Sequence, residues 1–414
     1  MVRAALASIA LGLTGAACST DTFSGDAFPI HVDVSAGPLM VHLRPSGGIG
    51  AGEALPATLD VLAPFTLIDS GDPRTITRED ITVTLLGLRA PGSTDLVARA
   101  QFDVGAVALH PCGASDDPTP VPPCTVGDPA APTAISAVLG ADALAGDAVR
   151  LALASSNVYV VPDIAGDDAS RTRECDAVFP SPFRGGGTLS LGGTEVSFPG
   201  RRIAIGACLG AAPAAVNPLD RGTNALLVLS TGLGPTLLSA SAYKRYCQVA
   251  AHGCDPDPSG LPRATALLPS GAITGGAAQL PALALVATPT SNARGPCQDL
   301  YASHALVADC VTTGPLCPTS GGVCGAPAAV ELSTPIDIIV VDDADPTLQA
   351  LRAELRPDQA EVDGIVGTRA LAALELDIDY PHGRMLARCV DGSCALRPRL
   401  VTCNYLPDVK ACLP

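Results

Sequence analysis

The stretch FTLIDSGDPRTIT, residues 65–77, can be laid over LLVLSTGLGPTLL, residues 226–238, without a gap. Each stretch begins as an apolar, strand-like run, reaches a turn of small residues and continues into a Thr-apolar pair. A block that recurs far along one chain indicates an internal duplication. The overlay pairs three residues in order: Asp69 with Ser230, Ser70 with Thr231, and Gly71 with Gly232.

A second block recurs in the same order. AISAVLGADALAGDAVRLAL, residues 134–153, can be laid over VDGIVGTRALAALELDIDY, residues 362–380, so that Gly140 falls on Gly367. Two blocks repeated in one order predict two similar lobes. The interval between the blocks is much longer in the second half, which predicts an insertion there, mostly the cysteine-rich stretch around residues 247–330.

The composition favours strands over helices. The chain has 42 Gly and 38 Pro among 414 residues, and its apolar runs are short and bounded by turn residues. This pattern is typical of many short β-strands joined by tight turns. The formal net charge of −16 argues against nucleic acid as a partner, because binding to phosphates needs a basic face.

An apolar strand that ends in Asp-Ser/Thr-Gly resembles the hallmark of pepsin-like and retropepsin-like aspartic proteases. The strings AVLG (137–140) and GIVG (364–367) are similar to the strand that crosses behind this hallmark in each lobe, and LDIDYPHGRMLA (376–387) resembles the family's closing hairpin. The resemblance spans roughly residues 37–390. It implies a mainly β, bilobal double β-barrel with few short helices, a central cleft and no cofactor.

The resemblance also implies roles for single residues. Asp69 would be the catalytic carboxylate of the first lobe, and the position of its partner is occupied by Ser230. Ser70 and Thr231 match the hydroxyl residues that brace the two hallmark turns, and Gly71 and Gly232 complete those turns.

The expected chemistry of this site depends on a second carboxylate. Two carboxyl groups about 3 Å apart share one proton, so that one activates a water while the other polarises the scissile carbonyl. A serine hydroxyl at position 230 can do neither near neutral pH. The sequence therefore predicts a non-catalytic protein that binds an extended peptide or polymer between its lobes. Two alternatives stay open: an active aspartic endopeptidase in which Asp69 has a non-standard partner, and an envelope structural or interaction protein on an unrelated β fold.

Two further acidic stretches have structural interpretations. Asp72 is expected to stabilise the turn before Pro73 rather than to replace the missing acid. In DDADP, residues 342–346, we expect Asp345 to cap a helix that begins at Pro346, with calcium binding as the alternative. No tyrosine lies between Asp72 and Ala134, where the resemblance would place the tyrosine of the flap over the cleft.

The N-terminus indicates export. Arg3 precedes the apolar run ALASIALGLTGAA, which has the length of a signal peptide. Small residues followed by Cys18 predict a signal peptide over 1–17 and a lipidated cysteine, with residues 18–36 as a tether. The expected location is the bacterial cell envelope, as an outer-membrane lipoprotein held to the membrane by its lipid. Periplasmic or secreted protein is the alternative.

The cysteine count fits an oxidising compartment. Fifteen cysteines less Cys18 leave an even number, and most lie in close pairs. The histidines show no metal-ligand spacing, so no metal site is expected. The pairs suggested by proximity are Cys112–Cys124, Cys175–Cys208, Cys247–Cys254, Cys297–Cys310, Cys317–Cys324, Cys389–Cys394 and Cys403–Cys412.

These observations give an expected domain plan. We expect a first lobe over residues 37–165, a connector over 166–187, a second lobe with the disulfide-rich insertion over 188–390, and a disulfide-containing tail over 391–414.

Overall fold

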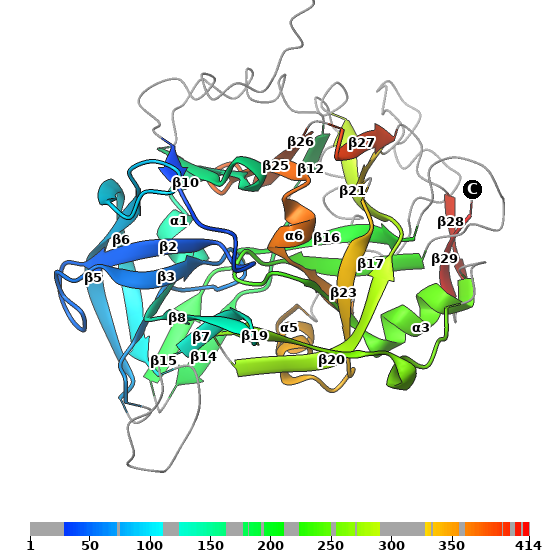
Figure 1. The fold of residues 1–414 in the computed structure, drawn as a ribbon, viewed down its shortest axis with the longest axis horizontal. Helices are drawn as coiled ribbons and strands as arrows, with labels where there is room; N and C mark the ends of the chain where they lie inside the picture. The colour runs from blue at the N-terminus through cyan, green and yellow to red at the C-terminus, as the bar shows by residue number, and fades with distance from the viewer. Residues whose placement is uncertain are drawn as a thin grey trace, which may run out of the picture.

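The computed structural model shows a mainly β protein with few short helices (Figure 1). The signal-like segment and Cys18 lie outside the described residues. The structure describes residues 29–72, 75–110, 124–162, 177–180, 182–191, 194–210, 223–249, 254–269, 271–289, 328–332, 334–355, 361–390, 392–397, 402–406 and 409–413.

One antiparallel sheet joins the two halves of the chain and lies along the top of Figure 1. Its central pair, β10 and β25, comes from opposite halves, and Arg150 lies directly across from Asp377. In spatial order the strands are β1 (Ile30–His31), β11 (Asn157–Pro162), β10 (Asp147–Ala152), β25 (Leu374–Asp379), β26 (Arg384–Cys389) and β12 (Ala177–Pro180).

The first lobe is built around three short strands. β3 (Leu55–Leu59) runs parallel to β9 (Ala137–Leu139), and β4 (Leu67–Asp69) pairs with β9 in the antiparallel sense on its other side. The loop from β3 to β4 therefore passes across the end of β9, which gives a ψ-shaped loop. The lobe also contains β2 (Met40–Pro45), β5 (Thr77–Leu88), β6 (Leu96–Leu109), β7 (Cys124–Asp128), β8 (Ala131–Ile135), α1 (Ala141–Leu144) and η2 (Leu153–Ser155).

The second lobe repeats this arrangement. β17 (Thr223–Leu229) runs parallel to β24 (Val362–Val366), which pairs on its other side with β18 (Thr236–Ser239). Around this ψ-shaped loop lie β13 (Phe183–Arg184), β14 (Gly187–Leu191), β15 (Thr194–Phe198), β16 (Arg202–Leu209), α3 (Ala240–Val249), η3 (Pro258–Gly260), β19 (Arg263–Leu268), β20 (Gly271–Leu280), β21 (Leu283–Pro289), β22 (Ala328–Leu332), β23 (Ile336–Val341), α5 (Pro346–Leu355), α6 (Thr368–Leu371), β27 (Cys394–Arg397), β28 (Thr402–Leu406) and β29 (Val409–Leu413).

The predicted match of Gly140 with Gly367 is found in the structure. Each glycine ends the middle strand of its ψ-shaped loop and begins the short helix that follows. A Cβ at Gly140 would lie 2.5 Å from the carbonyl carbon of Phe65, and one at Gly367 would collide with the carbonyl of Pro235. Only glycine permits this close approach of two backbones.

The first predicted block is in the wrong register. The loops that correspond in space are β3–β4 and β17–β18, which places Asp60, not Asp69, on Ser230. Two threonines fix this register, because Thr66 Oγ1 accepts a hydrogen bond from Gly140 N at 3.3 Å and Thr236 Oγ1 accepts one from Gly367 N at 3.4 Å. Asp69 lies at the end of the second strand.

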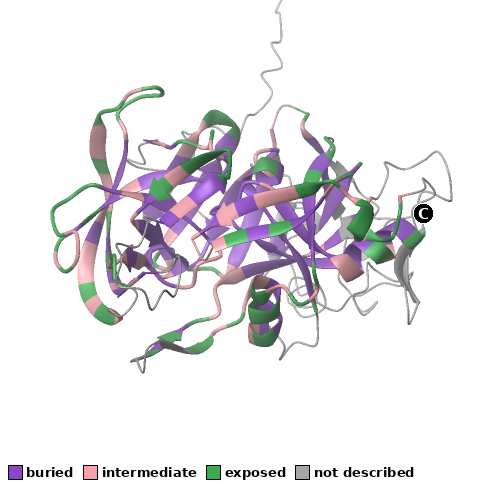
Figure 2. Ribbon diagram, turned by 60° about the horizontal axis from the view of Figure 1, so that its bottom comes forward, coloured by how far each residue is buried: buried purple, intermediate pink, exposed green. Residues whose placement is uncertain are grey.

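A continuous apolar core extends through both lobes and the sheet between them. It includes Leu59 and Val149 from the first half and Leu229 and Ile378 from the second, all with almost no exposed surface. In Figure 2 the buried segments lie mostly at the centre of the molecule, and the exposed ones lie mostly on its outer hairpins. Burial of this many aliphatic side chains supplies the stability that the few aromatic residues do not.

Two of the predicted disulfides are confirmed, Cys247–Cys254 and Cys389–Cys394. Cys124 is also disulfide-bonded. Cys403 and Cys412 lie directly opposite each other in the β28–β29 register. Each of the other predicted pairs includes a residue outside the described part of the chain. Among the described helices, none has the length and apolarity needed to cross a bilayer.

Candidate functional site

Two loops meet where the lobes face each other, and they bring Asp60 against Ser230. Asp60 follows β3 and Ser230 follows β17, so the two residues occupy equivalent places in the ψ-shaped loops. Ser230 Oγ donates a hydrogen bond of 2.9 Å to Asp60 Oδ1. The arrangement expected at Asp69, an acid facing an alcohol, is therefore formed by Asp60.

Thr231 links the two loops. Its Oγ1 accepts a hydrogen bond from Val61 N at 3.1 Å and donates one to Leu59 O at 2.7 Å, and the threonine has no exposed surface. This is the bracing role that the resemblance implied for Thr231. In the first lobe the equivalent residue is Val61, which has no hydroxyl, so the brace has one side chain instead of two.

Ser70 does not brace the loops. Its hydroxyl donates to Asp72 O at 2.8 Å within its own turn. Gly71, with φ +66°, donates its N–H to Asp69 Oδ1 at 2.8 Å and completes the same local turn. Asp72 accepts a hydrogen bond from Thr75 Oγ1 at 3.1 Å, in keeping with the turn-stabilising role expected for it.

Asp60 is buried among donors. Its Oδ1 accepts hydrogen bonds from Ser230 Oγ, from Thr231 N at 3.1 Å and from Leu62 N at 3.0 Å. Burial raises the pKa of the Asp60 carboxyl above its ordinary value, and these hydrogen bonds oppose part of that rise. Gly232 is required beside it, since a Cβ there would lie 2.6 Å from Asp60 Oδ2.

Asp69 lies in different surroundings. Its Oδ1 is 2.7 Å from His110 Nδ1, and the side chain of His110 is almost completely buried. Asp69, His110 and Cys124 are close enough together to hold a metal ion. Cys124 is disulfide-bonded, however, so it offers no thiolate ligand.

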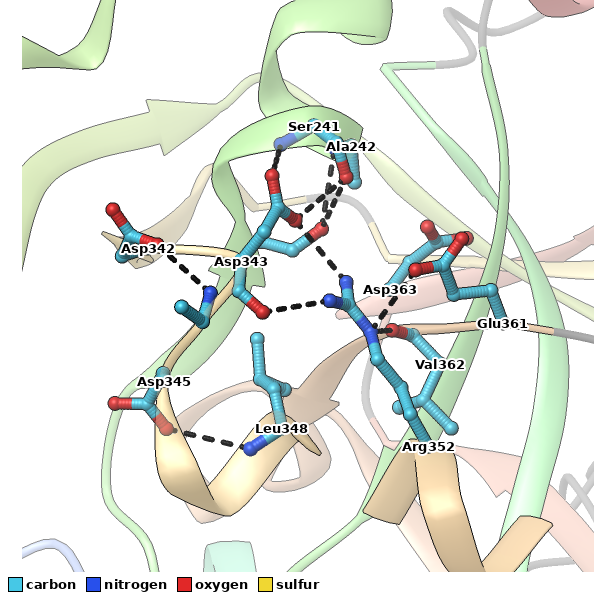
Figure 3. A network of polar contacts seen from close by, with 12 residues as sticks. Ser241, Ala242, Asp342, Asp343, Asp345, Leu348, Arg352, Glu361, Val362 and Asp363 are labelled. Atoms are coloured by element: carbon cyan, nitrogen blue, oxygen red, sulfur yellow. Dashed lines mark hydrogen bonds and ion pairs between the residues drawn. The ribbon is translucent and has the colours of Figure 1, made fainter. Parts of the chain in front are cut away.

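The acidic string at 342–346 forms the predicted helix start. Asp345 Oδ1 accepts hydrogen bonds from Thr347 N at 2.9 Å and Leu348 N at 3.3 Å, which caps α5. Figure 3 shows Asp343 between Ser241 and Arg352. An arginine partner neutralises the Asp343 carboxylate, and this favours the structural interpretation over calcium binding.

A groove opens between the lobes beside the second loop. It encloses about 560 Å³ and is lined by the end of β7, by β19, β20 and β23, and by Pro235 and Arg369. β19 is paired with β20 along its whole length, but on its other edge it meets β7 only at Leu267. The edge from Arg263 to Ala266 therefore has no strand beside it among the described residues.

The loop that carries Asp60 is covered on one side by the other lobe. Arg202, at the start of β16, donates from Nη1 to Leu62 O and forms an ion pair with Glu354 on α5, with Nη2 and Oε2 2.7 Å apart. The β14–β15 hairpin packs Phe198 against Phe65, with ring centroids 6.2 Å apart. No local sequence pattern predicts these contacts.

The strand order and the paired loops define the class of protein: a bilobal, pepsin-like double β-barrel in which the carboxylate of Asp60 faces the hydroxyl of Ser230 between the two loops. No family model matches the chain, and no curated protein is detectably similar in sequence. Among solved structures, an aspartic proteinase from Irpex lacteus is 10% identical, with 88% of this chain and 98% of that chain covered and a TM-score of 0.37. Basic 7S globulin from soybean is 11% identical, with 87% and 95% covered and a TM-score of 0.38. At such TM-scores the fold is assigned from the topology of this chain and not from these superpositions.

Proposed function

We propose that this protein binds an extended peptide between its lobes and does not cleave it. The observation that carries the proposal is the pair of Asp60 with Ser230, which supplies one carboxylate where acid-base hydrolysis needs two. Ser230 is almost completely buried and donates a hydrogen bond to Asp60, so it offers neither a base nor a matched acid.

The groove beside the loops supports peptide binding. Its lining includes Ala264, Thr265 and Ala266 of the open edge of β19, and an extended peptide can pair with such an edge through its backbone. Its floor is lined by small side chains, including Ala264, Ala266 and Ala277, which leave room for the side chains of a ligand. Arg369 lies at the rim with its side chain exposed.

A binding assay tests the proposal. A fluorescein-labelled pool of random eight-residue peptides is titrated with the protein, and anisotropy and mass spectrometry are followed at pH 4 and pH 7. We expect saturable binding with no new peptide fragments. Arg369→Glu should weaken binding about tenfold or more, whereas Arg44→Glu, an exposed residue of β2 outside the groove lining, should leave binding almost unchanged. Cleavage that Asp60→Asn abolishes would overturn the proposal in favour of a working peptidase.

We propose further that the binding takes place in the cell envelope, with the chain held to the membrane by a lipid on Cys18. Disulfides in the folded part are compatible with an exported protein. Incorporation of labelled palmitate that Cys18→Ala eliminates would support this location. Equal release of both variants into the medium would contradict it.

A further inference from the structure

The open edge of β19 is closed at one end by the β7–β8 hairpin. β7 meets β19 in the antiparallel sense at a single pair, Gly127 with Leu267. One residue later β7 ends at Asp128, and the chain turns back into β8 at Ala131. Figure 1 shows the hairpin beside β19. A strand added to the edge from Arg263 to Ala266 would therefore meet this turn and end there.

The closed end belongs to the lining of the groove and is tightly packed. Gly127 has φ +95°, and a Cβ on it would lie 2.8 Å from Ala36 O. A Cβ on the next residue, Gly37, would lie 3.0 Å from the Cα of Gly234. Ala36, Gly127 and Asp128 all line the groove. Backbone contacts across the two lobes thus hold the wall that the end of a bound strand would face.

Asp128 places a carboxylate at this closed end. The residue is exposed, and its Oδ1 accepts a hydrogen bond of 2.8 Å from Ala130 N, which holds the side chain within its turn. Among the described residues no cationic side chain forms an ion pair with it. The carboxylate is therefore left to attract a positive charge on the ligand. An unmodified peptide has such a charge at its amino end, because the α-amino group has a pKa of about 8.

The direction of the added strand decides which end of a peptide reaches Asp128. A ligand antiparallel to β19, as β7 is, would begin at the turn, so that its amino end lies beside Asp128. A ligand parallel to β19 would place its terminal carboxylate there, where the two negative charges repel. Antiparallel pairing is also slightly more stable per residue. The net charge of −16 attracts a positive end further.

The other charged residues of the lining do not compete for the amino end. Arg369, on α6, has the opposite sign and suits an acidic side chain of the ligand. Asp337 accepts a hydrogen bond of 2.8 Å from Gln279 Nε2, and it lies beyond the part of β20 that β19 covers. Asp128 is therefore the carboxylate of the lining that lies where the edge closes.

We infer that the groove binds the free amino end of an extended peptide, with the terminal ammonium against Asp128 and the backbone paired with the edge of β19. The inference rests on the proposed function, because both need a peptide in the groove, and it names the class of ligand. An internal segment of a longer chain does not fit, since the residues before it would collide with the β7–β8 turn. The ligands are therefore peptides, or proteins whose amino end is extended and unmodified.

Four peptide pools test the inference. All have the same random eight-residue composition without Lys or Arg, and the fluorescein is carried on a cysteine side chain near the carboxyl end. The amino end is free or acetylated, and the carboxyl end is free or amidated. In anisotropy titrations at pH 7, acetylation should raise the Kd about tenfold or more, whereas amidation should change it less than about threefold. Equal affinity of the free and acetylated pools would overturn the inference while peptide binding stands. If none of the four pools binds, the proposed function itself fails and the inference falls with it.

A protein variant tests the contact with Asp128. Asp128→Asn keeps an acceptor for Ala130 N but removes the charge, so the tenfold advantage of the free amino end should fall to less than about threefold. The matched control is Asp342→Asn, because Asp342 Oδ1 accepts a hydrogen bond of 2.8 Å from Ala344 N in an exposed turn outside the groove lining. This control should keep the full advantage. An advantage that persists unchanged in Asp128→Asn would show that the ammonium binds elsewhere, against the inference.

Discussion

At the scale of the residue, the site is defined by the difference between a carboxylate and a hydroxyl at equivalent places. Ser230 Oγ lies 2.9 Å from Asp60 Oδ1, which is close to the separation at which two carboxyl groups share a proton. The supporting groups, Thr231 and Gly232, are both present and hold Asp60 in place. The geometry of the second loop is thus retained, and only the second acid is missing.

Restoring that acid should create activity. Ser230→Asp would place two carboxyl groups in hydrogen-bond contact, and we expect cleavage of the peptide pool below about pH 5 to rise roughly 10²–10⁴-fold over the parent. The measurement is fragment release by mass spectrometry. Ser230→Asn is the control, because an amide of the same shape cannot carry the proton. A folded Ser230→Asp protein that binds peptide and still releases no fragments would contradict this expectation.

The pKa of Asp60 predicts a pH dependence of stability. Because burial raises the pKa in the folded state above the ordinary value of 3.8, the unfolded chain loses this proton first as the pH rises. The free energy of unfolding therefore falls with rising pH between the two pKa values, by about 1.4 kcal/mol for each unit of difference. Asp60→Asn, which retains an acceptor for Ser230, Thr231 and Leu62, should remove this fall.

Urea unfolding from pH 3 to pH 7 checks the sign. Relative to the parent, Asp60→Asn should gain stability steadily as the pH rises through 3.8, and the gain should level off above the folded-state pKa. A difference that does not vary with pH would show that the carboxyl titrates alike in both states.

At the scale of the element, the two ψ-shaped loops depend on one buried hydroxyl. Thr231→Val would leave Val61 N and Leu59 O without their partner inside the protein. We expect a loss of about 2–5 kcal/mol in the free energy of unfolding, because each unsatisfied buried group costs roughly 1–3 kcal/mol. Ser70→Ala removes a hydroxyl from an exposed turn and should cost less than about 1 kcal/mol. Urea unfolding of both variants measures the two losses. A larger loss for Ser70→Ala than for Thr231→Val would favour the register expected from the sequence, in which Ser70 braces the loops.

The register error has a specific cause. Asp69-Ser70-Gly71 has the residue types expected for the hallmark, whereas Asp60-Val61-Leu62 does not. An overlay based on the hallmark therefore aligns Asp69, and not Asp60, with Ser230. A better signal was present: in the observed register Leu59, Thr66 and Leu67 match Leu229, Thr236 and Leu237.

The match of Gly140 with Gly367 was predicted correctly because each lies at the end of a strand where a Cβ would collide with a nearby backbone carbonyl. The helix cap at Asp345 could be predicted for the same reason, since Asp before Pro is a short-range pattern. The contacts that cover the Asp60 loop could not be predicted. Phe198 on Phe65, and Arg202 on Leu62 and Glu354, join residues far apart in the chain, which no local periodicity reports.

At the scale of the whole molecule, the two lobes are joined at the centre of the interlobe sheet by a buried ion pair. Arg150 donates from Nε to Asp377 Oδ1 at 2.5 Å and from Nη2 to Oδ2 at 2.6 Å, and both side chains are only 2% exposed. Each residue comes from a different half of the duplicated chain, on the strands that meet at the approximate symmetry axis. The pair therefore fixes the register of one half against the other as well as contributing charge.

Removing one partner of this pair should cost far more than removing both. Arg150→Met or Asp377→Leu alone leaves a buried charge without its counter-ion, and we expect each to lower the free energy of unfolding by about 3–5 kcal/mol. The double variant leaves no charge behind, so its loss should be smaller than that of either single variant, which gives a strongly non-additive cycle. Arg89→Met is the control, because its pair with Asp95 is two-thirds exposed and should cost less than about 1 kcal/mol. Urea unfolding with the disulfides intact supplies all four values. Additive losses would mean that apolar packing, and not the matched charges, sets the alignment of the two lobes.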